Sequence, residues 1–321
     1  MLMKTRRQMW IEGYRLRPYL QHSSEQEIAE RLRYIIENMT TMTPSGKITA
    51  LPPEPRGKFW YELFEHALEE YRRRGIEPPP GFLKGAQVPN PAQPVSSAAL
   101  KAVSEARLAP DGTSLVKLGR RQHISNFYER SELRIAPASA YADPSLNSAI
   151  RDDELALSAF GQQSEVVIPA FDEAGALKFA TKPRGNLTYT SRERTNYYVQ
   201  CMATKLDARL FADFGYDACL IIHDHEEFER RLVKAVESHL PGWLGGAGPV
   251  SYLDPFNCKR DDMDVFIGKH LKYSYQHEYR FFWLPRPPSA IQSLTAFNVE
   301  LGSMREISSM IVLDPDSPAS G

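Results

Sequence analysis

The sequence KYSYQHEYRFFW, residues 272–283, is the stretch from which the fold of this chain is inferred. It is dense in aromatic residues, which favour β-strands, and it is followed by Pro285 and Pro287. Proline cannot donate a backbone hydrogen bond to a neighbouring strand, so these two residues end the strand. We therefore predict one continuous strand over residues 272–283.

Alternation of side chains gives this predicted strand a polar face and an aromatic face, because successive side chains point to opposite sides of a strand. Gln276, Glu278 and Arg280 share the polar face. The other face holds Tyr275, His277, Tyr279 and Phe281. Such a pattern is typical of a strand that lines a cleft and turns its aromatic face to the core. The alternative, which the strand alone favours, is an ordinary surface pair of Glu278 and Arg280 on an edge strand.

The composition is that of an ordinary globular protein. The 321 residues are enough for one large domain or for two domains of about 100–200 residues. The net charge of -1 provides no overall attraction to nucleic acid or to an anionic membrane. No apolar run approaches the roughly 20 residues of a membrane span, and the N-terminus lacks the apolar core of a secretory signal. The three cysteines form no CxxC motif, so we expect a reducing compartment, the cytoplasm, and no membrane partner.

Residues 1–75 are predicted to be helical. Ser24 and Glu27 have the spacing of a capping box, which marks the start of a helix. A second helix over 59–74 ends at Gly75, a typical helix C-cap. The three arginines at the end of that helix favour its dipole; alternatively, they contact a nucleic acid or an acidic partner.

A proline-rich linker and a mixed region complete the chain. Residues 76–112 are interpreted as a semi-rigid linker that contains one short helix over 97–108. Residues 113–321 alternate short strands with helices, which is typical of an α+β domain. The predicted strands lie at 114–118, 133–136, 166–171, 176–180, 197–203, 218–223, 250–253, 297–301 and 310–313. The predicted helices lie at 123–130, 206–214, 226–240 and 263–271.

Three further groups of residues are candidates for binding or chemistry. Lys117, Gly119 and Arg120 end the first strand of the mixed region, where a cation can meet a phosphate; alternatively, they form a solvated basic turn. The carboxylates at 152–154 can bind Mg²⁺ but more often begin a helix, here one that starts near Asp143. The third group is His223-Asp224-His225, in which Asp224 is a plausible helix N-cap and the two histidines are potential metal ligands.

The order of these features resembles the ADP-ribosyltransferase superfamily. A basic residue on an early strand at 116–119, followed by a helix and a strand, and much later Gln276-His277-Glu278, is similar to the arrangement by which that family holds NAD. The chain also resembles an uncharacterised bacterial family with YKY-like, NDP-like and E-Y-R motifs, here at 116–118, 142–144 and 278–280. The resemblance covers about 113–313 and leaves the N-terminal third aside.

Two positions depart from the superfamily pattern. The first strand carries Lys117 where the superfamily has His or Arg, unless Arg120 fills that role. The middle motif is either the stretch at 188–191 or one of the tyrosines Tyr197 and Tyr198.

The resemblance implies a fold, a substrate and roles for individual residues. For the mixed α+β domain, which follows the helical N-terminal region, the resemblance implies a split, largely antiparallel sheet. The resemblance implies that NAD is consumed and that Glu278 hydrogen-bonds a ribose hydroxyl and stabilises the oxocarbenium-like transition state, while Gln276 places the acceptor. The cofactor-binding residues it implies are Lys117, Gly119, Arg120, Tyr141, Tyr197 and Arg280, with Tyr141 or Tyr197 stacking on the nicotinamide.

The resemblance also implies a partner and a biological role. The ADP-ribose acceptor would be a protein, a nucleic acid or water. A bacterial toxin or anti-phage effector is the natural role, with a protein partner bound by the N-terminal helices. Two alternatives stay open, a non-enzymatic interaction module on the same fold and a metal-dependent nuclease. The enzymatic interpretation requires Lys117 and Glu278 to lie on neighbouring strands that face one hollow.

Overall fold

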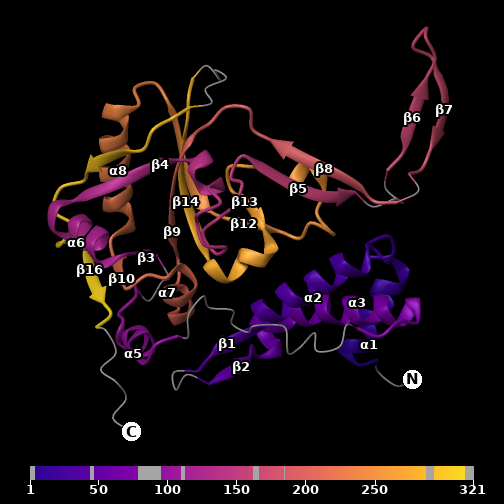
Figure 1. Ribbon diagram of the computed structural model, residues 1–321, viewed down its shortest axis with the longest axis horizontal. Coiled ribbons are helices and arrows are strands. Elements are labelled where there is room, and N and C mark those ends of the chain that lie inside the picture. The colour runs from indigo at the N-terminus through magenta and orange to yellow at the C-terminus, as the bar shows by residue number, and fades with distance from the viewer. Residues whose placement is uncertain are drawn as a thin grey trace.

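A computed structural model of the protein describes residues 4–43, 47–78, 95–109, 113–161, 166–183, 185–286 and 293–314. These residues form an N-terminal group of helices and a mixed region built on one large sheet (Figure 1). The predicted fold class, a helical N-terminal region followed by an α+β region with a split, largely antiparallel sheet, is confirmed. The predicted linker lies partly outside the described residues, and its described part holds α5 (Ser97–Glu105).

The N-terminal region consists mainly of α1 (Arg6–Leu16), α2 (Glu25–Met39) and α3 (Lys58–Arg74). The predicted capping box begins α2: the Glu27 amide donates to Ser24 Oγ, and the Ser24 amide donates to the Glu27 carboxylate. A short hairpin, β1 (Thr40–Met42) and β2 (Ile48–Ala50), and a π-helical turn (Pro53–Gly57) connect α2 to α3.

The arginines at the end of α3 form ion pairs with carboxylates of the same helix. Arg72 pairs with Glu69, and Arg73 and Arg74 pair with Glu70, at 2.7–2.9 Å. Both carboxylates are buried, so the arginines neutralise charge that the helix has withdrawn from water. Gly75 follows with φ of 67°, the left-handed C-cap that the sequence predicts.

The N-terminal helices share their hydrophobic core with the mixed region. Ile28 and Tyr71 pack in one cluster with Phe256, and Trp60 packs in another with Leu271. The helices are therefore part of the same folded body as the sheet.

The large sheet has eight strands, all paired antiparallel. Its main path runs β11 (Leu244–Pro249), β14 (Glu278–Leu284), β9 (Tyr198–Ala203), β3 (Leu115–Gly119), β10 (Ala218–Ile222) and β16 (Ser308–Val312). Beside that path, β4 (Glu132–Pro137) pairs with β9 and with β15 (Phe297–Glu300).

The sheet splits along one edge of β9. Strand β14 pairs with every residue of β9 along one edge, so both β3 and β4 must pair with the other edge of β9. Strand β3 meets the end of β9 at Ala203, through Val116, whereas β4 meets its beginning at Tyr198 and Val199. The two strands diverge between these contacts, and α6 (Arg121–Arg130) connects them. A fork therefore opens in the middle of the sheet.

Helices cover the two faces of the sheet. Leu220 and Ile222 of β10 pack with Phe127 of α6 and with Phe228 and Leu232 of α8 (His225–His239). On the other face, Cys219 and Ile221 pack with residues of α5 and α7 (Ala208–Phe214). Alternate side chains of β10 therefore pack into the cores on the two faces of the sheet, which is why this strand is apolar at every position.

The predicted strand over 272–283 is wrong in its first half. Residues Leu271–Gln276 form a 3-10 helix, η4, and the strand β14 begins only at Glu278. His277 lies between them with φ of 46°, a left-handed conformation that is uncommon outside glycine. Alternation is interrupted there, so Gln276 and Glu278 do not share a strand face, whereas Glu278 and Arg280 do.

Other element predictions also fail. The predicted helix over 263–271 is a turn followed by β13 (Gly268–His270), which pairs parallel with β12 (Ser251–Leu253). No helix begins at Asp143; the 3-10 turn η2 (Ala138–Ala142) precedes it and the residues at 152–154 are irregular. Five further strands were not predicted: β1, β2, β11, β5 (Ala156–Gly161) and β8 (Leu187–Arg192), with which β5 pairs.

The predicted hairpin over 166–180 is confirmed as β6 (Ile168–Phe171) and β7 (Leu177–Thr181). It extends away from the rest of the molecule (Figure 1).

Candidate functional site

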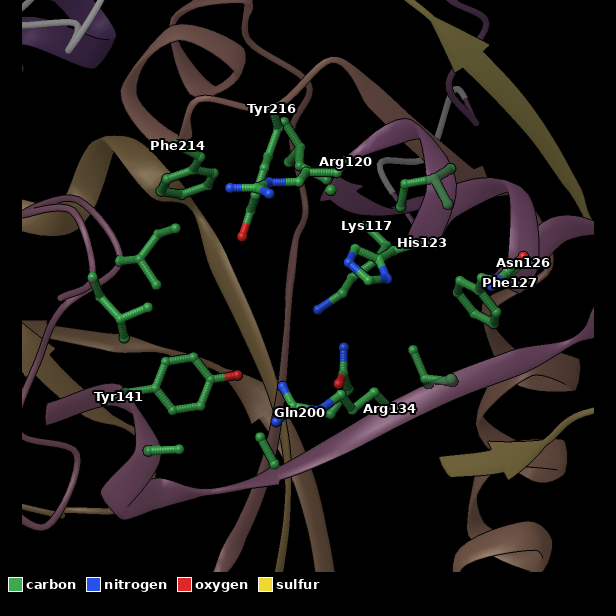
Figure 2. Close-up of a pocket in the computed structure, with 18 of the residues that line it drawn as sticks. Lys117, Arg120, His123, Asn126, Phe127, Arg134, Tyr141, Gln200, Phe214 and Tyr216 are labelled. Carbon is green, nitrogen blue, oxygen red and sulfur yellow. The ribbon is translucent and has the colours of Figure 1, made fainter. Parts of the chain in front are cut away.

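The fork between β3 and β4 holds a cleft of about 710 Å³. This volume lies within the range of about 300–1,000 Å³ that is usual for small-molecule sites. Its walls come from the end of β3, from α6, from β4, from the turn after η2 and from the segment that follows α7 (Figure 2). Gln200, in the middle of β9, lies at the bottom of the fork.

The cleft is basic. Its lining includes Lys117, Arg120, His123 and Arg134, whereas Glu132 is the one carboxylate among the described residues that line it. Cations on facing walls favour an anionic ligand, and arginine suits phosphate in particular because its planar guanidinium donates two parallel hydrogen bonds.

Aromatic side chains also line the cleft. Phe214, the last residue of α7, and Tyr216, two residues after it, lie on one side of the cleft, and Tyr141 points its hydroxyl toward the centre (Figure 2). The guanidinium of Arg120 extends toward Tyr216 in the same view. Flat rings beside cations are the combination that binds a nucleobase next to a phosphate.

Lys117 and Gln200 join the three strands of the fork. Lys117 Nζ donates to the carbonyl of Cys201 at 3.0 Å. The Gln200 amide satisfies both of its polar atoms when its oxygen accepts from Lys117 Nζ at 2.5 Å and its nitrogen donates to the Arg134 carbonyl at 3.0 Å. Burial lowers the pKa of Lys117, and the negative charge of Glu278 offsets this only in part.

A smaller hollow of about 120 Å³ adjoins the cleft. Lys117, Tyr141 and Tyr216 line both spaces. The residues that only the hollow adds include the polar groups Glu154, Lys269, Gln276 and Glu278. The hollow therefore extends the cleft toward Glu278, between apolar side chains and this group of polar ones.

Two carboxylates and two cations form a buried ion-pair network at the end of the hollow. Glu278 accepts from Lys269 Nζ at 2.7 Å and from Arg280 Nε at 2.6 Å. Glu154 lies 2.5 Å from Arg280 Nη2 and 3.8 Å from Lys269 Nζ. Arg280 is fully buried, at 0% exposure, and the other three are at most 6% exposed. Equal numbers of positive and negative groups let the protein bury all four charges.

The network acts differently on its two carboxylates. Burial alone would raise the pKa of Glu278, but Arg280 and Lys269 outweigh it and hold that pKa below its usual value. Burial raises the pKa of Glu154, and the negative charge of Glu278 adds to this, so that Arg280 and Lys269 offset the rise only in part. The two cations therefore favour the ionised form of Glu278, the carboxylate that lines the hollow beside Lys269.

Backbone contacts hold Glu278 at the start of its strand. Its amide donates to the Tyr252 hydroxyl at 2.7 Å. The carbonyl of the preceding His277 accepts from the amide and the hydroxyl of Thr204. Gln276 is held by its own amide, which accepts from Lys269 Nζ and donates to the carbonyl of Ala149.

Six of the eight predicted site residues lie at these two spaces. Lys117, Gly119, Arg120 and Tyr141 line the cleft, and Gln276 and Glu278 line the hollow together with Lys117 and Tyr141. Lys117 and Glu278 therefore face one hollow, but β9 lies between their strands, so the expectation of neighbouring strands is wrong.

Tyr197 and Arg280 occupy other positions than expected. Tyr197 is fully buried, and its hydroxyl donates to the backbone carbonyl of Glu154. Arg280 lies in the ion-pair network, where it pairs with Glu278 and Glu154, and lines neither space. Both residues position the carboxylates of the hollow. The alternative middle motif at 188–191 lies on β8, outside the large sheet.

Several site residues were not singled out from the sequence for this role. Glu154 was grouped with two other acids as a helix start, and nothing in the sequence pattern distinguishes Lys269 or Gln200. Arg134 alternates with apolar residues along β4, the usual pattern of a half-exposed strand, and Phe214 and Tyr216 flank the C-cap Gly215.

The residues considered as metal ligands have other partners. Asp224 is the N-cap of α8 and accepts from the Glu227 amide, as expected. His223 hydrogen-bonds Ser309, and His225 packs edge-on against Tyr279. Across the described residues, no three histidine, cysteine or acidic side chains are grouped so that they could hold a metal ion.

Comparison with known proteins finds no family model, no curated protein and no solved structure that matches this chain. In the part of the chain that the structure describes, no helix has both the length and the apolar character to cross a membrane.

Proposed function

We propose that this protein binds NAD in the cleft and breaks its nicotinamide–ribose bond, as ADP-ribosyltransferases do. The observation that carries the proposal is the common hollow of Lys117 and Glu278, which ends at an ionised carboxylate and opens beside a basic, aromatic cleft. A dinucleotide has matching parts: two aromatic bases, two riboses and a negatively charged pyrophosphate between them.

The volumes and the charges support one orientation of the ligand. The hollow of about 120 Å³ takes only the reacting end, and the cleft of about 710 Å³ takes the remainder. The pyrophosphate would then lie against Arg120 and Lys117, and a base would stack on Phe214 or Tyr216.

The expected reaction uses Glu278 as an electrostatic group. The C1′–N bond breaks, its electron pair leaves with nicotinamide, and the ribose carbon gains positive charge that an ionised carboxylate stabilises. A carboxylate offers about four lone-pair positions, so Lys269 and Arg280 leave room for a ribose hydroxyl. An acceptor hydroxyl or water then adds to the same carbon and releases a proton.

Nicotinamide release from NAD tests the proposal, with Glu278→Gln as the decisive variant. The substitution keeps the size of the side chain and removes its charge, so we expect turnover to fall by about 100-fold or more. NAD binding, followed by calorimetry, should remain measurable. Asp254→Asn is the matched control, since it also neutralises a buried carboxylate in a buried ion pair, with Arg31, but away from the cleft. Wild-type turnover in Glu278→Gln would contradict the proposal.

One observation favours a second candidate, a nucleotide-binding module without enzymatic activity. Both oxygens of Glu278 already accept from a cation, which is also how a purely structural carboxylate is held. This alternative predicts saturable NAD binding with no release of nicotinamide, so the same two measurements separate the two functions.

A further inference from the structure

The C-terminal end of α2 contacts both walls of the hollow. Asn38, the penultimate residue of α2, is 5% exposed and faces η4, the element that carries Gln276 and leads into Glu278. One residue earlier, the carbonyl of Glu37 faces Arg209 of α7, the helix that leads into Phe214 and Tyr216. These contacts come from the N-terminal region, which contributes no lining residue to either space among the described residues.

The Asn38 side chain uses both lone pairs of its oxygen and both of its N–H groups. Its oxygen accepts from Ser274 Oγ at 2.8 Å and from the Tyr275 amide at 3.1 Å. Its nitrogen donates to the Lys272 carbonyl at 3.0 Å and to the Tyr34 carbonyl of its own helix at 2.8 Å. Three of the four bonds therefore cross from α2 to η4, and two of those three bind the η4 backbone.

The element that Asn38 holds is one that its local sequence does not favour. The stretch 272–283 has the composition of a strand, yet its first part is a 3-10 helix that ends at His277 in the left-handed region. A left-handed conformation costs a non-glycine residue about 1–2 kcal/mol and persists only where surrounding contacts impose it. The bonds from Asn38 are contacts of this kind.

The second contact of α2 reaches the opposite wall. Arg209 Nη1 donates to the Glu37 carbonyl at 2.8 Å, at the helix end where the dipole favours a cation. The Arg209 guanidinium also lies 3.7 Å from the centre of the Tyr275 ring, and its Nε donates to Asp213. Arg209 therefore connects α7, α2 and η4.

We propose that Asn38 is a positioning residue through which the N-terminal helices set the geometry of the hollow. Its bonds hold η4 in the conformation that places Gln276 and Glu278 opposite Lys117. A change in the position of α2, such as one caused by a partner bound to the N-terminal helices, would alter the hollow through this contact. The functional part of this inference rests on the proposed NAD site, but the structural part does not.

Hydrogen exchange of the peptide over 271–278 tests the structural part directly. In Asn38→Ala we expect exchange there to be at least about tenfold faster than in the wild type, because three hydrogen bonds of about 1 kcal/mol each are lost. Ser274→Ala removes only one of the three bonds that cross to η4, so its exchange should lie nearer to the wild type. Ile28→Ala is the matched control: it removes buried apolar volume from the same helix, at a position that does not contact η4.

NAD affinity and turnover in the same variants test the functional part. We expect Asn38→Ala to lower turnover by about tenfold or more, Ser274→Ala to lower it less, and Ile28→Ala to leave turnover near the wild-type value. The inference is overturned if exchange over 271–278 is unchanged in Asn38→Ala, or if Ile28→Ala accelerates it equally. If the wild type neither binds nor consumes NAD, the proposed function fails, while the exchange measurement still decides the role of Asn38.

Discussion

Replacing Lys269 with methionine removes one cation from the buried ion-pair network with little change in side-chain volume. Lys269 is 5% exposed and donates to Glu278 at 2.7 Å and to Gln276 Oε1 at 3.1 Å. In the variant, Glu278 and Glu154 share Arg280 alone, so the buried network carries one uncompensated negative charge.

The expected loss of stability follows from this imbalance. Breaking a buried ion pair by removing one partner typically costs about 3–5 kcal/mol, because the remaining charge stays buried without compensation. An exposed pair on α8 is the control: Arg230 pairs with Glu227 at the protein surface, and Arg230→Met should leave the free energy of unfolding unchanged within measurement error.

The loss of stability in Lys269→Met should also depend on pH, and the ion-pair network determines whether it grows or shrinks as the pH falls. In the wild type the pKa of Glu278 is held below its unfolded value of about 4.3, so its contribution to stability is present above that pH and is lost as the pH falls through the folded pKa. Without Lys269 the folded pKa of Glu278 rises, because burial is then opposed by Arg280 only. Near pH 4.5, protonation of Glu278 in the variant therefore removes part of the uncompensated negative charge. The difference in the free energy of unfolding between the wild type and Lys269→Met is consequently smaller at pH 4.5 than at pH 7.

Denaturant unfolding at pH 7 and pH 4.5 measures both effects. Between these values Lys269 stays charged in both states, since burial opposes its positive charge but Glu278 and Glu154 raise its folded pKa above the usual value. The difference between the wild type and Lys269→Met therefore reports on the carboxylates. A difference below about 1 kcal/mol at pH 7, or one that grows on acidification, would refute the account of the network.

Two further predictions concern positions outside the network. Gly268→Ala should destabilise the protein by about 1–3 kcal/mol, measured by denaturant unfolding. The reason is that a Cβ at this position would overlap the backbone carbonyl oxygen of Asp264. A stability equal to that of the wild type would contradict the described turn. The double variant Phe171→Ser and Phe179→Ser should leave the melting temperature unchanged. Both rings are more than half exposed on the β6–β7 hairpin, and this hairpin pairs with no other described strand. A lower melting temperature would show that the hairpin contributes to the folded core.

The local sequence predicts the elements whose pattern is complete within themselves. The capping box at Ser24 and Glu27, the C-cap at Gly75 and the N-cap at Asp224 are satisfied by atoms a few residues away, so spacing is enough to recognise them. The same holds for β10, whose continuous apolar run indicates burial on both faces.

The elements that the sequence predicts wrongly depend on contacts from distant parts of the chain. The aromatic stretch at 272–276 has strand composition, but Asn38 of α2 bonds it as a 3-10 helix. The acidic residues at 152–154 have the composition of a helix start, but Glu154 is drawn into the ion-pair network by Arg280. Local propensity is weak, about 1 kcal/mol per residue or less, and a few tertiary hydrogen bonds or one buried ion pair exceed it.

The amino-acid sequence was enough to predict the α+β class and the order of the regions, and it pointed to most of the candidate site, because residues such as Lys117 and Glu278 carry chemistry that is visible from their type and spacing. The folded arrangement was needed to show that Arg280 and Tyr197 support the carboxylates, and that the site also includes Arg134, Gln200, Phe214 and Lys269. The physical reason is the fork at β9: two strands leave the same edge of one strand, and the side chains that meet in the opening come from segments with no pattern in common along the chain.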